Sequence, residues 1–134
     1  IQATVLWLYH HDLDAMQQFY EKLLGVTLLV DQGWAKVYQV AGSGFIGLVD
    51  GEYGMHKASE KKAVTVSFFT DNVEEWLEYI SNLEGFKLRT KKTADESGQA
   101  KILVGYDPEG YFLEWDTFLN TPENKALLQL LNKA

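Results

Sequence analysis

Few side chains in this sequence combine a reactive group with a position that chemistry could use. The histidines are His10, His11 and His56, and the absence of cysteine excludes a thiol nucleophile and a cysteine-ligated zinc site. His10 and His11 are adjacent near the end of a predicted strand, so they point to opposite faces and cannot form a chelating pair. We expect both imidazoles to be partly exposed. His56 lies in the glycine- and charge-bearing segment 51–62, which predicts an exposed loop.

Aromatic and acidic side chains recur on shared faces of the predicted strands. Alternation with a period of two predicts four such sets. They are Val5, Trp7 and Tyr9; Trp34 and Tyr38; Val64, Val66 and Phe68; and Phe112, Glu114 and Asp116. An aromatic wall with one or two carboxylates suits a flat, partly cationic organic ligand. Ordinary core packing of the same aromatic side chains is the alternative interpretation.

Length and composition are those of one ordinary globular domain. The chain has 134 residues, of which 46% are apolar and 23% charged, and its net charge is −7. An acidic chain is a poor candidate for nonspecific binding to nucleic acid or to an anionic membrane. No segment approaches the roughly 18 consecutive apolar residues of a membrane span. We therefore expect a cytoplasmic protein whose partners include neither nucleic acid nor membrane.

The elements that must position these side chains occur twice along the chain. A β-rich run ends at Asp12 and is followed by a helical period that stops at Gly25. A second β-rich run ends at Asp71, and the helical period after it stops at Gly85. Both aspartates are predicted helix N-caps, and Glu74 would complete a capping box with Asp71. Both glycines are predicted helix stops.

Three more strands are predicted after each helix, at 26–30, 34–40 and 45–49 and at 86–90, 100–106 and 111–116. The apolar stripes of the helices are Leu13, Met16, Phe19, Tyr20 and Leu23 in the first and Val73, Trp76, Leu77 and Ile80 in the second. The order of one strand, one helix and three strands occurs twice. This repeat predicts an α+β fold of two modules, 3–50 and 63–119. The helix would cover one face of each sheet and leave the other face free.

The last segment, 120–134, is predicted to be a helix that begins with Thr121 as N-cap and Pro122 at the first position. Its leucines would pack on the same domain or form a dimer contact. Both alternatives remain open at this point.

Two segments carry a family resemblance, HDLDAMQQFYEKLLG (11–25) and DPEGYFLEW (107–115). At these spacings, and within a duplicated chain, they resemble the vicinal oxygen chelate superfamily, which includes glyoxalase I, bleomycin resistance proteins and extradiol dioxygenases. The resemblance implies a glyoxalase-like domain over residues 1–119. In such a domain, tandem βαβββ modules form mixed sheets that curl into one cup with the helices outside.

Enzymes of this superfamily hold a divalent metal in the cup through four strand positions. Carried over to this sequence, those positions are Val5, Leu48, Val64 and Glu114, and only Glu114 can bind a metal. A shift of one residue in any strand restores neither histidine nor glutamate. We therefore expect no cofactor, with a divalent metal held by relocated ligands as the alternative.

The resemblance and the missing ligands together predict a small-molecule-binding protein that uses an aromatic cup, as antibiotic-binding proteins of the bleomycin resistance type do. The predicted ligand-binding residues are Trp7, Tyr9, Trp34, Tyr38, Phe68, Phe112 and Glu114. The alternative is a lyase or isomerase in which Glu114 and His56 act as acid–base groups, or a dioxygenase-type enzyme that uses Glu114 with a metal held by relocated ligands. By analogy with the family we expect a homodimer.

Overall fold

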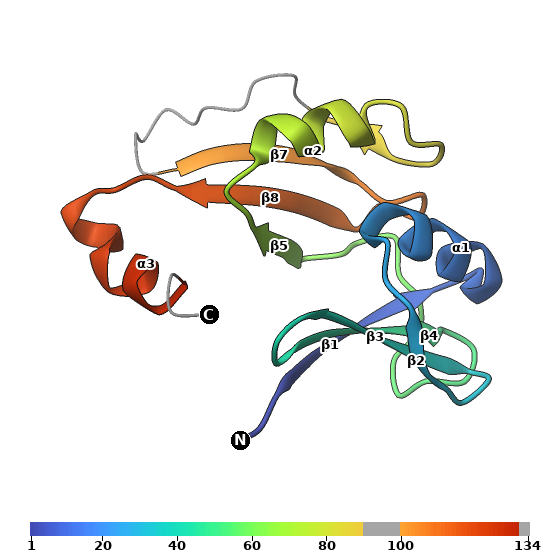
Figure 1. Cartoon of the computed structure of the whole chain (residues 1–134). Coiled ribbons are helices and arrows are strands. Elements are labelled where there is room, and N and C mark those ends of the chain that lie inside the picture. The colour runs from blue at the N-terminus through green and yellow to red at the C-terminus, as the bar shows by residue number, and fades with distance from the viewer. Residues whose placement is uncertain (90–99, 132–134) are drawn as a thin grey trace. The chain divides into compact units, whose positions relative to one another are not determined.

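The computed structural model describes residues 1–89 and 100–131, and the chain divides into two compact units, 1–62 and 63–134 (Figure 1). Unit 1 contains β1 (Thr4–His10), α1 (Leu13–Leu24), β2 (Leu28–Asp31), β3 (Ala35–Ala41) and β4 (Gly44–Asp50). Unit 2 contains β5 (Thr65–Phe69), α2 (Val73–Ile80), β6 (Lys87–Leu88), β7 (Ala100–Tyr106), β8 (Phe112–Phe118), the 3₁₀ turn η1 (Pro122–Asn124) and α3 (Lys125–Leu131). The predicted α+β class and the repeated element order are confirmed.

Each unit has one four-stranded mixed sheet. The strand order is β1-β4-β3-β2 in unit 1 and β5-β8-β7-β6 in unit 2. In both sheets the first strand runs parallel to the last strand of the module, and the remaining pairs are antiparallel. Parallel neighbours need a long crossover connection, and here that connection includes the helix that covers one face.

Helix α1 begins and ends where the sequence predicts. The side chain of Asp12 accepts a hydrogen bond from the backbone N–H of Ala15 at 3.0 Å, which caps the first turn. Gly25 ends the helix with φ of 64°, a left-handed conformation that glycine adopts without a Cβ penalty. The predicted stripe is the buried one: Leu13, Met16, Phe19, Tyr20 and Leu23.

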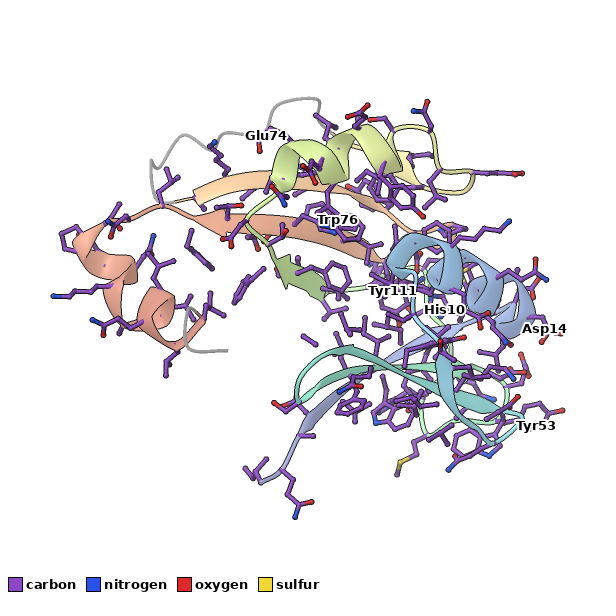
Figure 2. The ribbon with its side chains drawn as sticks, viewed as in Figure 1. His10, Asp14, Tyr53, Glu74, Trp76 and Tyr111 are labelled. Carbon is purple, nitrogen blue, oxygen red and sulfur yellow. The ribbon has the colours of Figure 1, made fainter. Side chains whose placement is uncertain are left out.

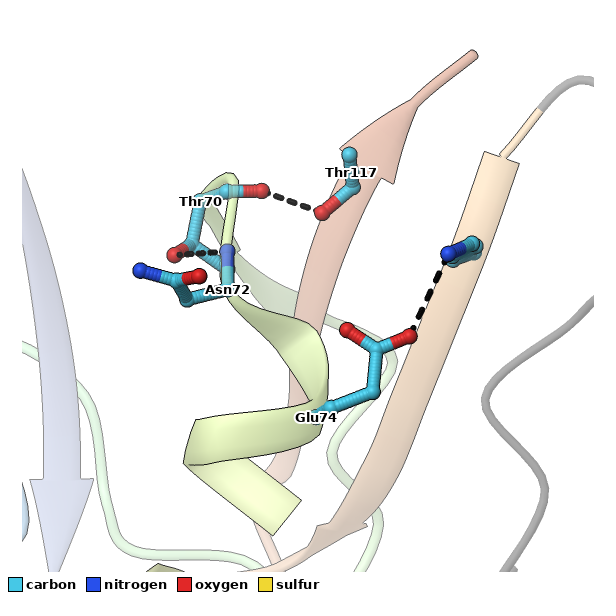
Figure 3. A network of polar contacts seen from close by, with 5 residues as sticks. Thr70, Asn72, Glu74 and Thr117 are labelled. Atoms are coloured by element: carbon cyan, nitrogen blue, oxygen red, sulfur yellow. Dashed lines mark hydrogen bonds and ion pairs between the residues drawn. The ribbon is translucent and has the colours of Figure 1, made fainter.

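Helix α2 is shorter than predicted, and its N-cap is Asn72 instead of Asp71. It ends at Ile80, before Gly85, which lies in the turn ahead of β6. The predicted capping box is therefore wrong. Asp71 is not the N-cap, and the carboxylate of Glu74 reaches toward β7, where it pairs with Lys101 at 3.2 Å (Figure 3).

Bonds between the end of β5 and β8 cause the late start of α2. The backbone N–H of Thr70 still donates to Asp116 of β8, so strand pairing continues past the end of β5. The hydroxyl of Thr117 donates to the carbonyl oxygen of Thr70, and the hydroxyl oxygen of Thr70 accepts from the N–H of Asn72 at 3.1 Å (Figure 3). These bonds keep Thr70 paired with β8, so Asn72 follows it by two residues, as Asp12 follows His10 in unit 1.

The core of unit 2 is aromatic. Trp115 is fully buried, and its ring lies 5.3 Å from that of Phe68, 5.5 Å from that of Trp76 and 5.7 Å from that of Phe86. Figure 2 shows Trp76 between α2 and β8. Gly105 of β7 leaves room for Phe86, because a Cβ at this position would overlap the ring.

Several predicted boundaries shift by one or two residues. Strand β7 matches the prediction, β2 and β6 are shorter, and Thr90 lies outside the described residues. No residue of α3 is buried, and Leu130 is 67% exposed, so the described part of this helix does not bury its leucines. The dimer contact stays a prediction. No helix in the described part of the chain is long and apolar enough to cross a membrane.

Tyr38 offers a test of the unit 1 core. Its hydroxyl is buried and has no hydrogen-bond partner among the described residues. We expect Tyr38→Phe to leave the free energy of unfolding unchanged or to raise it by up to about 1 kcal/mol. On folding, the hydroxyl loses its hydrogen bonds to water and forms no hydrogen bond among the described residues to replace them. Tyr38→Ala, the control, should lower the same quantity by about 3–5 kcal/mol through a cavity. Denaturant unfolding at pH 7 measures both.

The same variant should change the response to alkaline pH. Burial raises the pKa of the Tyr38 phenol above its ordinary value of 10.0, and the carboxylates of Glu21 and Asp31 raise it further. Above pH 10.0 the unfolded chain therefore releases this proton before the folded chain does, and the free energy of unfolding falls as pH rises. The fall should be shallower in Tyr38→Phe, and equal slopes would contradict the assignment.

Candidate functional site

Pairing between β1 and β4 determines which side chains of unit 1 face α1. Leu8 lies opposite Leu48, and both are fully buried on the side of α1. Trp7 lies opposite Gly47 on the other side of the sheet, here called the open face of unit 1. Val5 shares this open face with Trp7. The predicted pairing of Val5 and Leu48 at one site is therefore wrong, because the sheet separates them.

The ring of Trp7 rests on the backbone of Gly47. A Cβ added to Gly47 would overlap several carbon atoms of the indole. Trp7 is nevertheless 42% exposed, so the ring lies against the strand and presents an aromatic surface outward. Glycine at position 47 is what permits this arrangement.

The segment after β4 folds onto the same face at the Tyr9 end. The rings of Tyr9 and His56 meet edge to face with centroids 5.2 Å apart. Gly54 lies against Tyr9 and Val49 with no room for a Cβ. Of the residues that the sequence proposes, the structure therefore brings Trp7, Tyr9 and His56 to the open face of unit 1. Tyr53, in the same segment, is 74% exposed (Figure 2).

Trp34 and Tyr38 are not on this face. Tyr38 pairs with Ile46 across β3 and β4 and is fully buried on the side of α1. Trp34 precedes β3, and its carbonyl oxygen accepts from the N–H of Asp50. Trp34 is four residues before Tyr38, so the alternation of side chains along a strand places both on the α1 side of the sheet. Trp34 is 44% exposed there.

The open face of unit 2, on the side away from α2, carries a carboxylate among aromatic side chains. Ser67 lies opposite Glu114 in the β5–β8 pair, and its hydroxyl donates to Oε1 of Glu114 at 2.9 Å. Phe112 shares this face and packs against Tyr106 with centroids 5.4 Å apart. Phe68 lies on the opposite side, with Trp115 under α2, so the expectation that it shares a wall with Glu114 is corrected.

The histidines at the end of β1 also differ from expectation. His10 is fully buried, with its ring 6.0 Å from that of Tyr20 on α1 (Figure 2). His11 is exposed, and its Nε2 lies 3.5 Å from Oε1 of Glu60. They point to opposite sides, as alternation predicts.

When the two modules are aligned at the first residues of α1 and α2, the correspondence between their first strands shifts by one residue from the one that the sequence predicts. Leu13 matches Val73, so Trp7 matches Ser67 and its strand partner Gly47 matches Glu114. By the same count, Val5 matches Thr65 and not Val64. Sequence comparison alone missed this because an Asp stands near the end of both first strands.

The four family metal positions accordingly carry Val5, Gly47, Thr65 and Glu114. One carboxylate and one hydroxyl do not match the three protein ligands of catalytic zinc or the two histidines and carboxylate of non-haem iron. Within residues 1–89 and 100–131 no group of three or more His, Asp or Glu side chains is arranged to hold a metal ion. The donor set at these positions does not fit the divalent metal that the fold implies.

The sequence comparison with known families agrees with this architecture. A model described as the glyoxalase/bleomycin resistance protein/dioxygenase superfamily matches residues 2–115. The chain belongs to this superfamily. No curated protein matches the chain.

Solved structures of superfamily members and related proteins share the fold. TioX from Micromonospora sp. ML1 is 18% identical with a TM-score of 0.71, and the match covers 87% of this chain and 98% of TioX. Lactoylglutathione lyase from Agrobacterium tumefaciens is 19% identical with a TM-score of 0.68, and the match covers 85% and 91% of the two chains. The fosfomycin resistance protein FosX from Listeria monocytogenes, in a complex with Mn(II) and sulfate, is 16% identical with a TM-score of 0.69, and the match covers 93% and 95%.

Gly47→Ala tests whether the ring of Trp7 packs against the backbone of Gly47. The added methyl group would occupy the volume of the indole, so the ring must move away from the strand. We expect the Trp7 indole N–H resonance to shift and acrylamide quenching of tryptophan fluorescence to increase. Gly42→Ala is the matched control, because a Cβ at Gly42 meets nothing within 4 Å. An unchanged Trp7 resonance in Gly47→Ala would show that the ring does not rest on this glycine.

Proposed function

We propose that this superfamily member binds a small organic ligand on the open faces of its sheets, without the divalent metal that enzymes of the family use. The observation that supports this most is the exposed indole of Trp7 seated on Gly47. A large aromatic ring laid flat on a strand has one face against the backbone and the other available for stacking. A core tryptophan would be covered, as Trp115 is.

The chemistry of the other open face supports a ligand with a polar or cationic group. Glu114 is partly buried, and its carboxylate is oriented by the hydroxyl of Ser67. A carboxylate held in this way accepts hydrogen bonds from an amine or hydroxyl group. The aromatic pair of Phe112 and Tyr106 provides apolar surface beside it.

The family supports both binding and catalysis, since its description names resistance proteins as well as enzymes. We place this chain nearer to the bleomycin resistance type, because the metal positions offer only one carboxylate and one hydroxyl. The alternative is a lyase or isomerase that uses Glu114, or His56 beside Tyr9, as an acid–base group. In that case Glu114→Gln would abolish turnover of a ligand whose affinity it leaves largely intact.

Calorimetric titration with a flat aromatic cation, 9-aminoacridine, and with its neutral parent acridine tests the proposal. Trp7→Ala should weaken binding of both compounds about 10-fold, because each loses a stacking surface. Glu114→Gln tests the open face of unit 2 separately. It should weaken only binding of the cation at that face, about 3- to 10-fold, because the neutral compound does not need the carboxylate.

Trp34→Ala is the matched control, since Trp34 has nearly the same exposure as Trp7 but is assigned to the α1 side of the same unit. It should leave both affinities unchanged. Binding that Trp7→Ala leaves intact, or that Trp34→Ala weakens equally, would refute the assigned surface.

A further inference from the structure

The open face of unit 2 also carries a basic side chain, Arg89. The backbone N–H of Arg89 donates to the carbonyl oxygen of Val104, which continues the β6–β7 pairing one residue beyond β6. Val104 pairs with Glu114, and Glu114 pairs with Ser67. Ser67, Glu114, Val104 and Arg89 therefore form one row across the sheet, on one face.

The side chain of Arg89 lies over this face. Its guanidinium carbon is 5.4 Å from the ring centroid of Phe112, which is two residues before Glu114 on β8. The side chain therefore reaches across β7 toward β8. Contact with the ring holds one face of the guanidinium and leaves its N–H edges able to donate.

Arg89 and Glu114 do not neutralise each other. No ion pair joins them, although both lie within the described residues on the same face. Two strand spacings separate their backbones by about 10 Å, and two residues along β8 separate Phe112 from Glu114 by about 7 Å. The guanidinium and the carboxylate thus occupy separate places on this face, with the ring of Phe112 beside them and the buried Val104 between their strands.

We propose that the open face of unit 2 binds a dipolar ligand whose carboxylate is held by Arg89 and whose protonated amine is held by Glu114. The body of the ligand then lies beside the partly exposed ring of Phe112. Arg89 suits the anionic end because its planar fork donates two parallel hydrogen bonds to a carboxylate. Glu114 suits the amine because Ser67 already orients its carboxylate. This inference rests on the proposed function and replaces a purely cationic ligand with a dipolar one.

Three compounds with a benzene ring test the contribution of each charge. 4-(Aminomethyl)benzoate carries both charges, benzylamine only the positive one and benzoate only the negative one. Calorimetric titration at fixed, low ionic strength should show the dipolar compound binding at least 10-fold more tightly than either singly charged one. Arg89→Gln should reduce its affinity to that of benzylamine without changing the affinity for benzylamine. Glu114→Gln should reduce the affinity for the dipolar compound to the affinity for benzoate.

Lys87→Gln is the matched control, because Lys87 is a cation on the same edge strand but lies in the neighbouring row, opposite Tyr106. It should leave the preference for the dipolar compound unchanged. Both basic residues are exposed, so neither substitution removes a core contact.

The outcomes separate the two proposals. Equal affinity for benzylamine and the dipolar compound, or a preference that Lys87→Gln removes and Arg89→Gln spares, overturns the dipolar inference while the binding function stands. Failure of all three compounds and both acridines to bind overturns the two together.

Discussion

Parallel pairing between the first and last strands of each module is the constraint on which the other features of this protein depend. Because side chains alternate along paired strands, the register of β1 with β4 and of β5 with β8 decides which residues face the helix and which remain open. A shift of one residue would bury Trp7 and Glu114 and expose Leu8 and Trp115. The buried aromatic cluster around Trp115 and the apolar stripe of α1 oppose such a shift.

The two units use equivalent positions for different chemistry. Where unit 1 pairs Trp7 with Gly47, unit 2 pairs Ser67 with Glu114. One pair presents a flat aromatic ring and the other an oriented carboxylate, and neither provides the imidazoles that a metal in this superfamily needs. The indole of Trp7 and a metal-ligating side chain at position 47 exclude each other, since any Cβ at that position would overlap the ring.

Local patterns in the sequence predicted the local parts of this structure. The cap at Asp12, the stripe of α1 and the bounds of β7 depend on residues close in sequence, and they are confirmed. The start of α2 depends on bonds from Thr70 to Thr117, 47 residues away, and the prediction there was wrong by one residue. That single error moved Phe68 to the wrong face. The contact of Trp7 with Gly47 and the reach of Arg89 to Phe112 depend on strand register in the same way, so neither could be predicted from spacing alone.

We infer that the positions that hold a metal elsewhere in the family serve organic ligand binding in this protein. The most direct test is the content of bound metal after stripping with chelator and dialysis against low-micromolar zinc, nickel, manganese and iron(II), measured in the native chain and in Glu114→Gln. We predict that neither protein retains a stoichiometric amount of any metal, because Glu114 is the only carboxylate at those positions. Retention of about one ion per chain, lost in Glu114→Gln, would contradict the account and return the protein to the metal-dependent members of its superfamily.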